Sequence, residues 1–113
     1  ARYPMARAMI DHGCPVVLAT DFNPGSSPTP SLPFVMHLAC TQMRMTPAEA
    51  LTAVTVNAAA SLGMADSVGS LEAGKRADFV VLGISDWREL SYWVGRRLVH
   101  SVYMDGERLL EVA

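Results

Sequence analysis

One aspartate lies where a reactive group would be useful, at the end of a hydrophobic run. The stretch "LATDFNPGSS", residues 18–27, passes from apolar residues to turn residues at Asp21. If residues 14–20 form a buried parallel strand, Asp21 lies beyond its carboxyl end, where α/β folds bind their ligands. A carboxylate there can bind a metal, act as a general base, or do both. A capping or turn-forming aspartate that only organises the loop fits the spacing equally well.

The loop after Asp21 contains three residues that could contact a small substrate. Asn23 offers an amide, Gly25 an unobstructed backbone and Ser26 a hydroxyl, and such polar groups orient bound ligands. All three are also common turn residues, so composition alone favours a structural role. The loop therefore supplies candidates for binding and leaves both roles open.

The histidines do not supply a metal site by their spacing. His12, His37 and His100 form neither an H-x-H nor an H-x-x-x-H pair, which are spacings typical of metal ligands. A zinc site usually needs three or four protein ligands, and only Asp21 is a good candidate. Glycine-rich phosphate loops and G-x-S-x-G motifs are also absent from the sequence, so it does not predict nucleotide binding or serine hydrolysis.

Composition excludes several classes of protein. Half of the 113 residues are hydrophobic and 18% are charged, which is typical of one globular domain. The net charge of −2 gives no reason to expect nucleic acid or an anionic membrane as partner, and no apolar run approaches the roughly 18 residues of a membrane span. Cys14 and Cys40 lack C-x-x-C spacing. We therefore predict buried free thiols and a cytoplasmic protein.

The elements expected to position Asp21 are helices around one strand. Helical spacing predicts a helix over residues 4–13, the apolar run predicts a parallel strand over 14–20, and proline, glycine and serine predict a loop over 21–31. An apolar stripe predicts a helix over residues 32–44. The capping box "TPAE" opens a further helix over residues 46–62.

The rest of the sequence is typical of antiparallel strands. Gly69 and Gly74 flank an expected short strand and turn, and residues 78–82 predict a second strand. Residues 86–95 are amphipathic. The final residues predict a hairpin of two strands joined by a two-residue turn at Asp105-Gly106.

Three stretches, in this order, resemble the C-terminal part of the amidohydrolase superfamily of metal-dependent hydrolases. "LATD" resembles its last barrel strand, "TPAEALTAVTVNAAASLGM" the helix that follows, and "VGSLEAGKRADFVVL" with "MDGERL" the small β-sandwich beside the barrel. The implied fold class is α/β. Residues 1–65 would be the last strand, active-site loop and helices of a TIM-like barrel, and residues 66–113 would be strands of the accompanying β-sandwich.

The resemblance also implies roles for the loop residues. Asp21 would be a ligand of a catalytic Zn or Fe ion and would accept a proton from the attacking water. Residues 19–51 resemble the members that open the ring of 4-imidazolone-5-propanoate to N-formimidoyl-L-glutamate in histidine degradation, with "DFNPGSS" as the discriminating loop. In such an enzyme Asn23, Gly25 and Ser26 would contact the small-molecule substrate, and the metal would polarise the ring carbonyl.

The family's other ligands, an H-x-H pair and a further histidine, come from earlier strands that these residues do not include. We therefore expect an inactive fragment that holds no metal, from a parent hydrolase for which a homodimer is possible. Because residues 14–20 would expose apolar strand edges, we also expect the isolated chain to self-associate.

Two other interpretations stay open. Another amidohydrolase, such as a nucleobase deaminase or a cyclic amidase, would share the aspartate at the strand end but would not need "NPGS" after it. A helix-plus-sandwich binding module without chemistry would use Asp21 only as a turn former.

Overall fold

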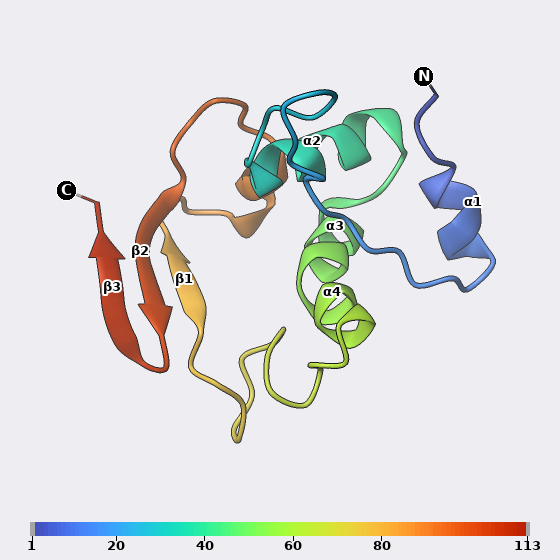
Figure 1. Cartoon of the computed structure of the whole chain (residues 1–113). Helices are drawn as coiled ribbons and strands as arrows, with labels where there is room; N and C mark the ends of the chain where they lie inside the picture. The colour runs from blue at the N-terminus through green and yellow to red at the C-terminus, as the bar shows by residue number, and fades with distance from the viewer. Residues whose placement is uncertain (1, 113) are drawn as a thin grey trace.

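The structure is a computed structural model that describes residues 2–112, and it places helices beside a three-stranded sheet (Figure 1). The helices are α1 (Ala6–Asp11), α2 (Leu32–Gln42), α3 (Pro47–Val54), α4 (Val56–Ser61) and the short 3-10 helix η1 (Trp87–Ser91). The strands β1 (Phe79–Leu82), β2 (Val99–Met104) and β3 (Glu107–Glu111) form an antiparallel sheet in the order β1-β2-β3. The chain is therefore a small α/β unit, as predicted.

Helices α2 and α3 begin at side chains that cap them. The Ser31 hydroxyl accepts a hydrogen bond from the Phe34 amide at 3.3 Å. At α3, the Thr46 hydroxyl accepts from the Glu49 amide at 3.2 Å, and the Glu49 carboxylate accepts from the Thr46 amide at 2.8 Å. This reciprocal pair satisfies two amides that the first helical turn cannot. The capping box predicted from the sequence is confirmed.

The single helix expected over residues 46–62 is wrong, because the chain breaks at Thr55. Its φ and ψ are −120° and −87°. The Thr55 hydroxyl donates to the Leu51 carbonyl at 2.7 Å and takes the place of the backbone amide that a regular helix would use there. The Thr55 amide bonds to the Thr52 carbonyl instead, at 3.3 Å. Gly69 approaches this break so closely that a Cβ on it would lie 2.6 Å from the Ala59 Cβ.

Residues 14–20, predicted as a parallel strand, form no strand in this structure, because no strand within residues 2–112 pairs with them. Their backbone bonds to helices instead. The Leu18 amide donates to the Ala53 carbonyl at 3.2 Å, and the Asn57 side chain donates to the Val16 carbonyl at 2.9 Å. Val16 and Leu18 are 8% exposed but Val17 is 42% exposed, so the segment buries one face rather than the expected two.

The hairpin at the end of the chain is confirmed. Asp105 and Gly106 connect β2 to β3 with φ values of 50° and 81°. Both are left-handed, as the favoured two-residue hairpin turn requires. Strand β1 falls within the predicted residues 78–82. The short strand expected between Gly69 and Gly74 does not form, and these residues make turns.

The core lies where α1, α2, α3 and residues 14–20 meet. Its buried residues are small or flexible: Ala6, Val16, Leu18, Met36, Ala39, Met45, Ala50 and Ala53. Cys40 is half-buried, whereas Cys14 is exposed, so the prediction of two buried thiols is wrong for Cys14. The helices in residues 2–112 are all too short or too polar to traverse a lipid bilayer.

Candidate functional site

Asp21 is exposed and has an unusual backbone conformation. Its φ is 48°, in the left-handed region that residues with a Cβ rarely adopt, although aspartate and asparagine enter it more readily than others. Hydrogen bonds hold the backbone on both sides. The Ser27 hydroxyl donates to the Thr20 carbonyl at 2.6 Å, and the Asn23 side-chain amide donates to the Asp21 carbonyl at 2.7 Å. The loop therefore fixes the direction in which the chain leaves residues 14–20.

The Asn23 side chain organises the loop. Its carbonyl oxygen accepts from the Gly25 amide at 2.9 Å and from the Ser26 amide at 2.8 Å. Its backbone amide donates to the Ser27 carbonyl at 2.9 Å. The structure thus brings Asp21, Asn23, Gly25 and Ser26 together in one hydrogen-bonded loop.

These bonds limit what the loop can still offer to a ligand. The amides of Gly25 and Ser26 already donate to Asn23. The Ser26 hydroxyl lies 3.3 Å from the same Asn23 oxygen, a long contact that a better acceptor could replace. A Cβ at Gly25 would also lie 3.3 Å from that oxygen, so a side chain there would crowd Asn23. Among the side-chain groups of Asn23 and Ser26, the Ser26 hydroxyl and the second Asn23 amide hydrogen are left for a ligand.

The Asp21 carboxylate fits the role of a single metal ligand. Among residues 2–112, no side-chain hydrogen bond or ion pair joins this carboxylate to another residue, and carboxylate oxygens bind Zn and Fe. The same residues contain no group of three or more His, Cys, Asp or Glu side chains able to hold a metal ion. His12, His37 and His100 lie on separate elements, at the end of α1, on α2 and on β2. One ligand fits, and a complete set is not present in the described part of the chain.

Two residues that the sequence did not single out connect the site to the fold. Ser27 closes the loop onto Thr20, and Asn57 anchors Val16 within the segment that leads to Asp21. Asn57 is polar within the apolar run "TVNAAA", which is a recognisable signal of a buried hydrogen bond. Ser27 resembles any loop serine, so only the structure reveals its bond.

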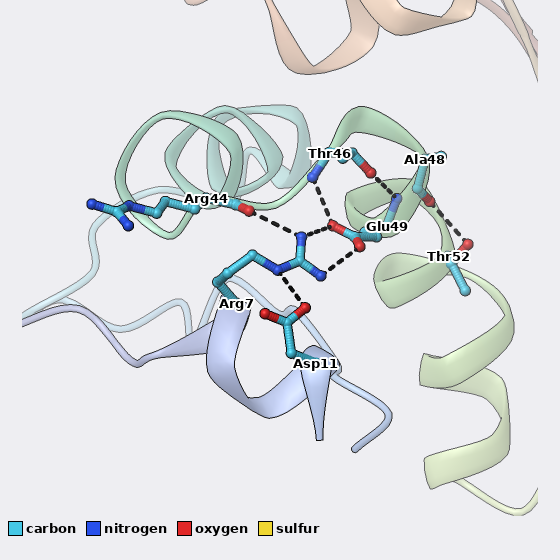
Figure 2. Close-up of polar contacts among 7 residues, drawn as sticks. All are labelled: Arg7, Asp11, Arg44, Thr46, Ala48, Glu49 and Thr52. Atoms are coloured by element: carbon cyan, nitrogen blue, oxygen red, sulfur yellow. Dashed lines mark hydrogen bonds and ion pairs between the residues drawn. The ribbon is translucent and has the colours of Figure 1, made fainter. Parts of the chain in front are cut away.

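A charged cluster joins α1 to α3 (Figure 2). The Arg7 guanidinium on α1 makes two 2.9 Å bonds to the Glu49 carboxylate on α3, and a 3.0 Å bond to Asp11. Hydrogen bonds from Arg7 and, second in effect, from the Thr46 amide together lower the pKa of Glu49 to about 2. Glu49 therefore serves the cap of α3 and the contact with α1 at the same time.

A cavity of about 460 Å³ lies between α2 and η1. Its walls include His37, Cys40, Arg88 and Tyr92. The His37 Nδ1 atom lies 3.2 Å from the Ser91 carbonyl oxygen in the same region. None of the predicted site residues lines this cavity, so it is separate from the Asp21 loop.

Comparison with known proteins agrees with the arrangement of these elements. The amidohydrolase family matches residues 2–109. The chain is 62% identical, over 95% of its length, to imidazolonepropionase of Solibacter usitatus, and 52% identical over 90% to that of Geobacillus thermodenitrificans. It covers 26% and 24% of those proteins. A zinc-bound adenosine deaminase from Xanthomonas campestris superposes with a TM-score of 0.87 at 25% identity, over 96% of this chain and 28% of that one.

The chain therefore spans about a quarter of the length of the curated relatives that it matches. The resemblance predicted from "LATD", the capped helix and the final strands is confirmed by these matches. Because the family match extends over nearly all of its residues, the chain belongs to the amidohydrolase family.

Proposed function

We propose that this chain is the C-terminal part of an imidazolonepropionase, which opens the ring of 4-imidazolone-5-propanoate to N-formimidoyl-L-glutamate. The observation that carries the proposal is the 62% identity to the Solibacter usitatus enzyme over 95% of the chain. An alignment over 95% of the chain spans both the Asp21 loop and the capped helix. The chain covers 26% of that relative, so the activity would belong to a longer protein.

Within that protein, Asp21 would be one ligand of a Zn or Fe ion. Its exposed carboxylate and its fixed backbone support this role. When bound, the ion would polarise the ring carbonyl and make a nearby water more acidic. Asp21 would take the proton from that water and pass it to the departing ring nitrogen, as a carboxylate at the reacting centre can.

The neighbouring loop residues would contact the substrate. The second amide hydrogen of Asn23 and the hydroxyl of Ser26 are side-chain groups that the loop leaves available. Gly25 would let the backbone approach the substrate, and a Cβ there would lie 3.3 Å from the Asn23 Oδ1 atom and crowd the side chain that organises the loop. These roles predict a rise in KM when Ser26 is replaced by alanine.

Residues 14–20 would be the last strand of a TIM-like barrel, once neighbouring strands supply the missing hydrogen bonds. The half-exposed Val17 supports this assignment, because a second packed layer would bury it. Residues 1–65 would then form the end of the barrel, and residues 66–113 would form part of the β-sandwich. Alone, the chain would be inactive and would self-associate. A monomer seen by light scattering at high concentration would contradict the self-association.

A hybrid enzyme tests the proposed function. The whole chain replaces the matching 26% of the Solibacter usitatus imidazolonepropionase, and the consumption of 4-imidazolone-5-propanoate is followed by absorbance. We expect activity within about tenfold of the parent, because a substitution pattern at 62% identity preserves most packing contacts. A folded hybrid that binds zinc but does not consume the substrate would contradict the proposal.

A nucleobase or nucleoside deaminase is the second candidate, and one observation favours it. The adenosine deaminase of Xanthomonas campestris superposes with a TM-score of 0.87. The reciprocal hybrid, with the chain in place of the matching 28% of that deaminase, separates the two functions. Activity on adenosine in this hybrid, with none in the first, would favour the deaminase.

A further inference from the structure

We infer that Ser27 is a positioning residue that holds Asp21 in the orientation needed to bind its metal. This inference rests on the proposed function of Asp21, and it adds a residue outside the predicted substrate contacts. Ser27 is half-buried. Ser27 would act indirectly, by holding the Thr20 carbonyl and, through it, the backbone of Asp21.

Ser27 bonds to the chain on both sides of Asp21. Its hydroxyl donates to the Thr20 carbonyl, the group directly before Asp21, at 2.6 Å. Its own carbonyl accepts from the Asn23 amide at 2.9 Å. The pairing of Asn23 with Ser27 forms an isolated antiparallel bridge. Ser27 is therefore bonded to Thr20 and to Asn23, and Asp21 and Phe22 are the two residues between these partners.

Asp21 needs such a restraint because packing does not supply one. Asp21 is exposed, and Phe22 beside it is 63% exposed. The left-handed φ of 48° at Asp21 is unfavourable for an L-residue. An exposed residue in an unfavourable conformation persists only when bonded groups around it enforce that conformation.

The Ser27 bond also differs from the other bond at Asp21. The Asn23 side chain reaches back only two residues to the Asp21 carbonyl and could move together with the loop. The Ser27 hydroxyl spans seven residues and ties the far end of the loop to residues 14–20, which the helices hold through Val16 and Leu18. Ser27 therefore transmits the rigidity of the helices to the metal ligand.

Removing this bond should affect metal binding and turnover more than substrate binding. Groups that orient a metal ligand without touching the metal typically account for about 10- to 100-fold in metal affinity or activity. The test uses the hybrid enzyme with Ser27→Ala and Ser27→Thr, the second of which keeps the hydroxyl. Ser31→Ala is the matched control, because the Ser31 hydroxyl caps α2 at Phe34 and does not bond to Thr20 or Asp21.

For each variant we would measure kcat, KM, the zinc Kd by competition with a chelator, and the circular dichroism spectrum. We expect Ser27→Ala to lower kcat and to raise the zinc Kd by about 10- to 100-fold, with KM within about twofold. Ser27→Thr should recover most of both losses. Ser31→Ala should leave kcat and the zinc Kd close to those of the parent hybrid.

Several outcomes would overturn the inference. One is an unchanged zinc Kd in Ser27→Ala, and another is a rise in KM alone, which would make Ser27 a substrate contact. If Ser27→Ala fails to fold, Ser27→Thr decides: a folded threonine variant with the hydroxyl in place but weak zinc binding would contradict the role. An inactive parent hybrid would instead contradict the proposed function, and the zinc Kd values would still test Ser27.

Discussion

Two aspartates in this chain share the same uncommon backbone conformation and use their carboxylates differently. The φ of Asp21 is 48° and that of Asp105 is 50°. The Asp105 carboxylate is bonded to the Arg76 guanidinium at 3.0 and 3.2 Å. The Asp21 carboxylate has no such bond within residues 2–112, although its backbone is held by Ser27 and Asn23.

The comparison shows that a left-handed aspartate does not by itself identify a functional site. At Asp105 the conformation is a requirement of the hairpin turn, and the ion pair with Arg76 uses the side chain. At Asp21 no hairpin demands the conformation, and the loop constrains the backbone while it leaves the carboxylate accessible. The difference in carboxylate availability, rather than the conformation, is what favours a ligand role for Asp21.

The largest expected effect comes from exchanging the carboxylate of Asp21 for an amide. In the hybrid enzyme, Asp21→Asn should lower kcat by at least about 100-fold, since a positioned acid–base group typically contributes that much or more. Asparagine tolerates the left-handed conformation, so the thermal midpoint should change little. Asp105→Asn is the matched control and should keep full activity. Equal loss of activity in both variants would remove the distinction between the two aspartates.

The next largest effect concerns the bond that fixes the segment before Asp21. The segment before Asp21 depends on a tertiary bond from Asn57 to the Val16 carbonyl. Asn57→Ala should cost about 1–3 kcal/mol in the free energy of unfolding, because it leaves a carbonyl in the core without its partner. Ser61→Ala removes an exposed bond within the same helix and should cost less than half as much. Urea unfolding of the hybrid measures both, and similar losses would show that Asn57 has no special role.

A third carboxylate, that of Glu49, differs from both aspartates in that it makes the stability of the fold depend on pH. Arg7, together with the Thr46 amide, lowers the pKa of Glu49 in the folded chain to about 2, below the ordinary value of a glutamate. The stability from this pair is therefore complete above the unfolded pKa, near 4.5, and is lost as the pH falls toward 2. Glu49→Gln keeps an acceptor for the Thr46 amide but removes the charge. It should flatten the fall of the thermal midpoint between pH 5 and about 2.

Asp86 is a necessary control in that experiment. Arg88 lowers the pKa of Asp86 to about 2 as well, so Asp86 contributes to stability in the same pH range. Asp86→Asn should remove a separate part of the pH dependence, and the double variant should remove both. A pH profile that Glu49→Gln leaves unchanged would show that the Arg7 contact does not support α3.

The smallest effect is expected at Asp105. Asp105→Asn should change the free energy of unfolding by less than about 1 kcal/mol, because an exposed ion pair contributes little and Asn-Gly suits this turn. Asp105→Ala should cost more, about 1–2 kcal/mol, since alanine is unfavourable at a positive φ. Urea unfolding compares the two. Equal losses in the two variants, both of which remove the ion pair, would show that the ion pair with Arg76 dominates over the turn.

Much of the local structure could be predicted from the sequence. The capping box at Thr46 and Glu49 and the turn at Asp105-Gly106 both appear as expected. Each depends on contacts between residues that are close in sequence, so the residue types are sufficient. The break at Thr55 was not predicted, since it depends on a hydroxyl that competes with the backbone and on the approach of Gly69.

For the candidate site, the sequence by itself determined the carboxylate at Asp21, the turn residues that follow it and the resemblance to the amidohydrolase superfamily. Only the tertiary structure decided that residues 14–20 bond to α3 and α4 rather than to a strand, and that Ser27 closes the loop onto Thr20. Strand pairing depends on which backbone groups lie alongside the segment, and a loop hydroxyl's bond depends on where the chain returns in space. Neither is encoded in residues that are neighbours in sequence, so both had to be read from the fold.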